Sequence, residues 1–130
     1  MTIGADVLVL AEHLEGKVAP SSFELVAKGR ELAAESGGRA KALLLGHGVD
    51  DLARDLAGYG IEVLHVDDPA LAEYSEGAYG QVVGSLLESV NPRLLLVAHT
   101  AQGYDLAPGI AGTLDLPLAC NCVDVRFDGA

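Results

Sequence analysis

The sequence predicts one α/β domain, a Rossmann-like parallel sheet of about five strands with helices on both faces. Short, nearly uninterrupted apolar runs, typical of strands covered on both faces, alternate with amphipathic helical patterns. No internal repeat or low-complexity linker interrupts this alternation, which is the pattern of a doubly wound layer structure. Half of the 130 residues are apolar, so one core can form without disulfides or metal.

Four segments are predicted to be parallel strands. The three most apolar cover residues 7–11, 42–45 and 94–98. The fourth, residues 61–66, contains Glu62 and His65, which favours a position near the sheet edge. The favoured strand order is 3-2-1-4-5, although the pattern alone does not separate it from the flavodoxin-like order.

The first two helices are predicted between these strands. The first begins near Ser21, whose spacing to Glu24 predicts a capping box, and ends at the Ser-Gly-Gly of residues 36–38. Its apolar stripe consists of Leu25, Val26, Gly29, Leu32 and Ala33. The second helix covers residues 49–57 and is closed by Gly58 and Gly60.

The third helix has the clearest pattern, and Asn91-Pro92 ends it. Its apolar positions are Tyr79, Val82, Val83, Leu86, Leu87 and Val90. A fourth helix is predicted from Leu106, Ala107, Ile110, Ala111 and Leu114. Pro108 is compatible with it if it lies in the first turn, where backbone N–H groups have no partner within the helix.

Residues 118–127 are predicted to form the fifth strand. From Val123 the chain alternates strictly, with Val125 and Phe127 inward, which is antiparallel behaviour. Asp128-Gly129 then gives a hairpin signal. We therefore expect residues 1–130 to be a single domain truncated at its C-terminal hairpin.

Charge and composition disfavour several classes of function. Nineteen acidic and eight basic residues give a net charge of -11, which repels nucleic acid and anionic membranes. The acids are spread out as a solvated surface, and an acidic docking face for a protein remains an alternative.

The chain has no predicted membrane span or leader. No apolar run approaches the roughly 20 residues of a membrane span, and the N-terminus lacks the basic residues of a leader, so we expect a soluble, cytoplasmic protein. Cys120 and Cys122 are interpreted as reduced packing residues.

No catalytic or metal-binding constellation is found in the sequence, so an enzyme is not expected. The four histidines lie in different elements without ligand spacing, and no Gly-Lys-Ser or Gly-Lys-Thr motif occurs. Gly46-His47-Gly48 starts like a dinucleotide fingerprint but lacks its third glycine, so it is interpreted as a turn. Asp67-Asp68 precedes Pro69 and is interpreted as a turn as well.

The candidate binding residues are Thr100, Gln102, Gly103 and Asp105, between the fourth strand and the next helix. Ligands of such sheets bind beyond the carboxyl ends of the strands, and a helix N-terminus favours an anion. These residues are therefore a candidate nucleotide or interface loop. Alternatively, Thr100, Gln102 and Asp105 satisfy the loop and cap the helix.

Three passages resemble the electron transfer flavoprotein family, and its alpha subunit in particular. They are residues 66–79, residues 91–98 and residues 100–108, the last reading Thr-Ala-Gln-Gly-Tyr-Asp-Leu-Ala-Pro against the family's Thr-x-x-Gly-x-Asp-Leu-Ala-Pro. Val7 to Glu12 and Gly16-Lys17 fit as well, so the resemblance covers nearly the whole chain. It implies the N-terminal domain of an alpha subunit, with adenine nucleotide alpha hydrolase-like topology.

The resemblance also implies partners and cofactors. The family forms a heterodimer of alpha and beta subunits that carries electrons from dehydrogenases, commonly the acyl-CoA dehydrogenases of fatty acid beta-oxidation, to a quinone oxidoreductase. FAD is held mainly by a separate C-terminal domain of the alpha subunit, which this sequence lacks. The structural AMP belongs to the beta subunit, whose loop reads Asp-x-x-Thr-Gly-Gln, whereas residues 99–103 here read His-Thr-Ala-Gln-Gly. This chain would then act as scaffold and subunit interface.

Two other classes of function remain as alternatives. A stand-alone adenine-nucleotide-binding module would use Thr100 and Gln102. An enzyme of the nucleotide-hydrolase class would need a phosphate-handling loop or metal ligands, which the sequence does not provide.

Overall fold

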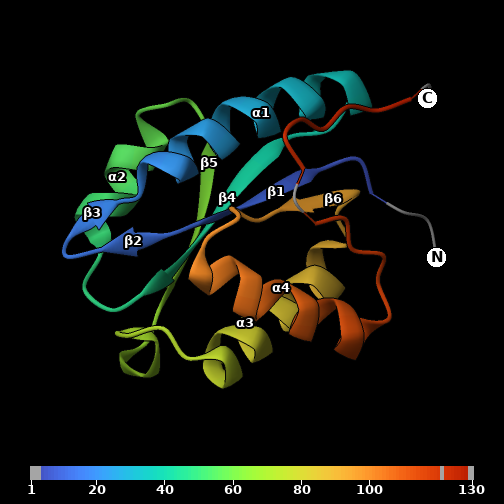
Figure 1. The fold of residues 1–130 in the computed structure, drawn as a ribbon. Helices are drawn as coiled ribbons and strands as arrows, with labels where there is room; N and C mark the ends of the chain where they lie inside the picture. The colour runs from blue at the N-terminus through green and yellow to red at the C-terminus, as the bar shows by residue number, and fades with distance from the viewer. Residues whose placement is uncertain (1–3, 121, 129–130) are drawn as a thin grey trace.

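The computed structural model describes residues 4–120 and 122–128 and has a four-stranded parallel sheet at its centre (Figure 1). The strands are β1 (Val7–Ala11), β4 (Ala40–Gly46), β5 (Glu62–Asp67) and β6 (Leu94–Leu96), in the order β5-β4-β1-β6. Val7 of the central strand β1 pairs with Ala40 on one side and with Leu94 on the other. This confirms the predicted order for the first four strands and the predicted edge position of β5.

Helices cover both faces of the sheet, as predicted. Helices α1 (Pro20–Ser36) and α2 (Asp50–Ala57) lie on one face, and α3 (Glu76–Val90) and α4 (Ala101–Leu114) lie on the other (Figure 1). Because side chains alternate along a strand, β1 contributes to both layers. Val7, Val9 and Ala11 face α1 and α2, whereas Leu8 and Leu10 face α3 and α4. All five are buried, as expected for a central parallel strand.

Helix α1 follows its predicted stripe, but the predicted capping box is wrong. The N-cap residue is Ala19, which makes no side-chain cap, and Pro20 opens the helix. Proline suits this position because its ring fixes a helical φ and its missing N–H would have no partner there. Glycine at position 29 lets the helix approach the sheet, since a Cβ there would come within 2.6 Å of Val9 Cγ2. The helix ends as predicted at Gly37, with φ of 77°.

Helix α3 has the predicted apolar face and ends where predicted. Tyr79, Val83 and Leu87 are its buried residues. Ser75 caps its N-terminus by accepting a hydrogen bond from the Ala78 N–H, at 3.3 Å. Asn91 closes it in the left-handed conformation, with φ of 50°. A 3-10 turn, η1 (Pro69–Leu71), connects β5 to this helix.

Helix α4 starts earlier than the position of Pro108 predicted. It begins at Ala101, so Pro108 lies inside the helix and not in its first turn. The N-cap residue is Thr100, whose side chain accepts a hydrogen bond from the N–H of Gly103. The cap at Thr100 stabilises a helix start at Ala101. Pro108 has no backbone N–H, so α4 lacks one of its internal hydrogen bonds and is less stable than it would be without the proline.

The predicted fifth strand is not formed among the residues that the structure describes. Residues 116–120 and 122–128 run as an extended segment without strand pairing beside β6 and α1 (Figure 1). Val125 and Phe127 are partly buried against the α1 side of the core, as the alternation predicted, but Val123 is fully exposed. The turn predicted at Asp128-Gly129 includes a residue outside the described part.

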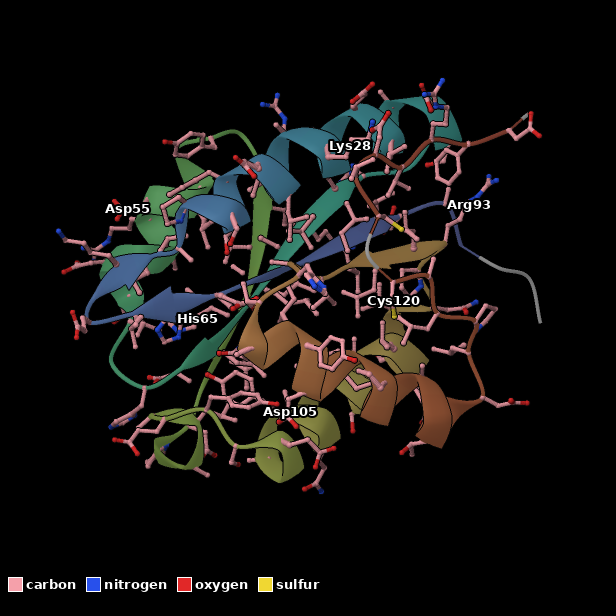
Figure 2. The ribbon with its side chains drawn as sticks, viewed as in Figure 1. Lys28, Asp55, His65, Arg93, Asp105 and Cys120 are labelled. Atoms are coloured by element: carbon pink, nitrogen blue, oxygen red, sulfur yellow. The ribbon has the colours of Figure 1, made fainter. Side chains whose placement is uncertain are left out.

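Side-chain contacts fix this C-terminal segment against the domain. Lys28 Nζ of α1 lies 2.8 Å from Asp124 Oδ1, and the Arg93 guanidinium lies 4.2 Å from the centre of the Phe127 ring. Figure 2 labels Lys28 and Arg93 on either side of the segment. The cysteines are free but exposed, which contradicts their interpretation as packing residues.

Candidate functional site

The candidate site lies at the carboxyl ends of β1 and β6. The chain passes from β1 to β4 and β5 on one side, and β6 lies on the other side of β1. Connections therefore diverge between β1 and β6, which makes this place the topological switch point of the sheet, where ligands of doubly wound folds bind. The residue after β1 is Glu12, and α4 begins close beyond β6.

Glu12 is buried and its backbone is fixed. Its N–H donates to Ser22 Oγ at 2.7 Å, and its carbonyl oxygen accepts from the N–H of Ala19 at 2.8 Å. Only 7% of Glu12 is exposed, and Ser22 is fully buried. The chain then leaves the sheet as a hairpin of β2 (His13–Leu14) and β3 (Lys17–Val18), whose turn residues Glu15 and Gly16 both have positive φ.

The Glu12 carboxylate meets the N-terminus of α4 through Thr100. Thr100 Oγ1 lies 2.8 Å from each carboxylate oxygen and donates to them, while it accepts from the N–H of Gly103 at 3.1 Å. Within the described part of the chain, Glu12 forms no ion pair. Burial raises the pKa of Glu12, and the hydrogen bond from Thr100 offsets part of that rise.

The structure brings three of the four predicted residues into defined contacts. Thr100 and Gly103 belong to the chain of hydrogen bonds that ends on Glu12. Asp105 Oδ2 accepts from the Tyr74 hydroxyl at 2.7 Å, and burial together with this carboxylate raises the pKa of Tyr74. Gln102 lies half-buried in the first turn of α4. These contacts agree with the capping interpretation, and a ligand role for the four residues stays a prediction.

Gly103 is required by the packing at this position. A Cβ added to it would overlap the carbonyl oxygen of Ala98, just beyond β6. The first turn of α4 therefore lies directly on the end of β6. This close approach aims the N-terminus of α4 at the switch point.

Hydrogen bonds also stabilise the carboxyl ends of β4 and β5, the strands next to β1 on one side of the sheet. His13 Nε2 lies 2.7 Å from the carbonyl oxygen of Leu45, and the Tyr79 hydroxyl donates to the same oxygen at 3.1 Å. Asp67 Oδ1 accepts from the Gly48 N–H at 3.1 Å and lies 3.2 Å from His47 Nδ1. The N–H of Gly48 and then His47 lower the pKa of Asp67. Residues 47 and 48 form a bend between β4 and α2, with Gly48 at a φ of 69°, in agreement with the interpretation of this passage as a turn.

The described residues provide neither a metal site nor a membrane span. They contain no group of three or more His, Cys, Asp or Glu side chains that could hold a metal ion. No helix in the described part of the chain is long and apolar enough to cross a bilayer.

Two cavities lie away from the switch point. One of about 420 Å³ lies between the end of α1 and the starts of β4 and β5, lined by Arg30 and Arg39 among others. The other, of about 200 Å³, lies between α3 and α4, and four of its nine lining residues are glycines. Neither contains Glu12 or Thr100, so neither adds to the site.

Glu12 is a site residue that was not predicted from the sequence. Thr100 was predicted, but its partner Glu12 lies 88 residues earlier in the chain. A charged residue directly after the most buried strand was the available signal, because a carboxylate at that position lies at the carboxyl edge of the sheet.

Comparisons with known proteins show that the chain is similar to electron transfer flavoprotein subunits. The family model described as electron transfer flavoprotein domain matches residues 7–130. The acryloyl-CoA reductase electron transfer subunit beta of Anaerotignum propionicum is 36% identical over 95% of this chain and 34% of its own length. The electron transfer flavoprotein subunit alpha of Bacillus subtilis is 34% identical over 98% of this chain and 39% of its own length. Subunit LctC of the Acetobacterium woodii lactate dehydrogenase (NAD(+),ferredoxin) is 36% identical over 89% of this chain. The chain therefore spans between a third and two fifths of the length of the first two of these relatives.

Proposed function

The chain belongs to the electron transfer flavoprotein family, and from this premise we propose that it is the N-terminal scaffold and subunit-contact domain of an alpha subunit. The complete carrier would take electrons from acyl-CoA or similar dehydrogenases and deliver them to a quinone oxidoreductase. The observation that carries the proposal is the family match over residues 7–130, in a chain much shorter than the subunits it resembles. We also propose that residues 1–130 form one domain of a longer carrier.

The flavin that the family name implies does not fit the switch point of this chain. A flavin dinucleotide brings a pyrophosphate, which needs unoccupied N–H donors or cationic side chains. Here the Thr100 hydroxyl already donates to the Glu12 carboxylate, and the Gly103 N–H donates to Thr100 Oγ1. This geometry supports placing FAD outside this chain, and AMP, if the carrier holds one, in the beta subunit.

The proposed role is that of a carrier component and not of a catalyst. The relatives include subunits named for electron transfer, and some of them are parts of a reductase or a dehydrogenase. The polar groups at the carboxyl edge fix β2 and α3 to the end of β4, and the start of α4 to the end of β1. Such use suits a rigid support for a redox centre that lies elsewhere.

The start of α4 is the proposed contact for the beta subunit. Tyr104 is 65% exposed, and its ring lies 5.8 Å from that of His99 in an edge-on arrangement. Exposed tyrosines suit interfaces because they bury a large apolar ring while the hydroxyl stays hydrogen-bonded. The neighbouring Gln102 and Asp105 supply polar groups at its rim. The net charge of -11 would speed association with a basic partner surface and make it sensitive to salt.

Binding to the beta subunit of the same organism tests the proposal. The alpha chain with the change Tyr104→Ser is expected to bind at least tenfold more weakly, whereas Tyr59→Ser, a matched control at a tyrosine that is 52% exposed elsewhere, should bind normally. Equal binding by both variants would refute the interface. The isolated chain should be colourless and release no nucleotide on denaturation. Bound FAD or AMP would instead support the stand-alone nucleotide-binding module.

A further inference from the structure

Glu12 is a buried carboxylate that the scaffold role leaves unexplained. It has no cationic partner in the described part of the chain, although a buried charge without one is costly. Its side chain accepts hydrogen bonds from one hydroxyl group, that of Thr100, the N-cap residue of α4. The carboxylate therefore lies at a helix N-terminus, where anions bind in other proteins.

We infer that Glu12 is a built-in substitute for a ligand anion, which fills the phosphate position at the switch point and so excludes phosphate-bearing ligands from this domain. The inference goes beyond the proposed function, which depends on association with the beta subunit and not on whether this position can be opened. It assigns to Glu12 a role in specificity, namely the rejection of nucleotides.

The Glu12 carboxylate is linked to the N-terminus of α4 through the side chain of the N-cap residue. Helix α4 has 14 residues, and its Gly103 N–H donates to Thr100 Oγ1. Thr100 in turn donates to the carboxylate and lies at the same distance, 2.8 Å, from both of its oxygens. The positive end of the helix is thus coupled to the negative charge of Glu12.

The carboxylate cannot easily give way to a ligand. The backbone of Glu12 is tied on one side to Ser22 Oγ and on the other to the Ala19 N–H. The side chain is nearly buried, so a phosphate at the same donors would overlap it and meet a like charge at low effective dielectric constant. Steric exclusion and charge repulsion therefore act together.

Removing the carboxylate should create an anion site. The test uses titration with inorganic phosphate and then with AMP, followed by calorimetry and by backbone amide chemical shifts. The variants are Glu12→Ala, Glu12→Gln and, as a control with the same change of charge, Glu88→Ala, at an exposed position on α3. Glu12→Ala is expected to bind phosphate at least tenfold more tightly than the unaltered chain or Glu88→Ala, with shifts centred on residues 100–103.

A second change identifies the donors. Thr100→Ala added to Glu12→Ala should abolish the gained binding, because it removes the hydroxyl that would hold the phosphate. Tighter binding of AMP than of phosphate would show that the opened position accepts a nucleotide, whereas equal binding would limit it to the anion. Either result supports the inference.

The inference fails if the unaltered chain binds phosphate or AMP as tightly as Glu12→Ala does. It also fails if a folded Glu12→Ala protein behaves like Glu88→Ala. Should Glu12→Ala not fold, Glu12→Ser decides, since it also removes both the charge and most of the side-chain volume. A folded Glu12→Ser protein must bind phosphate more tightly than the unaltered chain and than Glu12→Gln, which keeps the volume. Association with the beta subunit is measured separately, so failure here leaves the proposed function standing.

Discussion

Replacing Thr100 by valine is expected to destabilise the domain strongly, because a single hydroxyl serves two buried groups. It caps α4 through the Gly103 N–H, and it is the side-chain donor to Glu12. Loss of an N-cap costs about 0.5–2 kcal/mol, and loss of a hydrogen bond to a charged group costs about 1.5–3 kcal/mol. Since one group makes both contacts, we expect a loss of about 3 kcal/mol in the free energy of unfolding at neutral pH.

The assay is urea denaturation followed by far-UV circular dichroism. Thr100→Ser keeps the hydroxyl and should lose about 1 kcal/mol or less, which makes it the matched control for the lost methyl group. The double variant Thr100→Val with Glu12→Gln, compared with the two single variants, closes a cycle. Its coupling term measures how much the negative charge of Glu12 strengthens this contact, because a glutamine oxygen still accepts from the hydroxyl.

The cost of Thr100→Val should also depend on pH. The folded-state pKa of Glu12 lies above its ordinary value of 4.5, so this carboxyl favours folding when protonated, and its contribution is lost as the pH rises through the folded pKa. Removing the Thr100 hydroxyl raises that pKa further. The loss should therefore be smaller near pH 4 than near pH 7.5. A valine variant equal to the serine variant at both pH values would refute the reasoning.

Three further predictions concern packing and charge. Gly103→Ala should cost about 2–3 kcal/mol in urea denaturation because its Cβ would overlap the Ala98 carbonyl, whereas Gly112→Ala, where a Cβ meets nothing within 4 Å, should stabilise α4 by up to about 1 kcal/mol; equal effects would refute the packing argument. Pro108→Ala should raise the thermal midpoint, with a gain of about 1–3 kcal/mol, because it restores a backbone donor inside α4; a lower midpoint would show that the ring itself is needed. Asp6→Asn should destabilise more at pH 7 than at acidic pH, since a backbone N–H and then a lysine hold the pKa of Asp6 below 3.8. That stabilisation is lost as the pH falls through the lowered pKa, and a pH-independent loss in a pH series of melts would contradict this.

The sequence predicted the sheet well because its strands are buried on both faces. Continuous apolar runs such as Val7–Ala11 have few alternative explanations in a chain of this length. The order of the first four strands was the favoured choice, but the pattern did not separate it from the flavodoxin-like order; the pairing of β1 with β4 and β6 decides it. The edge position of β5 followed from its mixed composition.

The errors come from features that local patterns do not determine. The capping box predicted at Ser21 is not formed, because α1 begins one residue earlier, at Pro20. The fifth strand has the right alternation in residues 123–127, but strand pairing needs a neighbour, and an amphipathic pattern does not supply one. Pro108 was assigned to a first turn because its cost to a helix interior is large, although the cap at Thr100 fixes the start of α4.

The candidate site was half predicted. Thr100 was recognised from its place after a strand, where polar residues gather in such folds. Glu12 was not, because its significance comes from burial and from a partner far along the chain, which become visible only when β1 and β6 lie side by side. The periodicity of a sequence predicts which face of a strand or helix a residue lies on, but not which residue it contacts there.

The central position of β1 has a consequence for how the chain is made. The strand is synthesised first, yet its partners begin only at Ala40 and Leu94. During translation the five residues of β1 therefore have no β6 to pair with until most of the domain has left the ribosome. Such late pairing is slow. It leaves the apolar side chains and the unpaired backbone groups of β1 exposed to contacts with other unfolded chains. We expect ribosome-bound chains that end before β6 to depend on chaperones, and those that include α4 to become resistant to protease in one step.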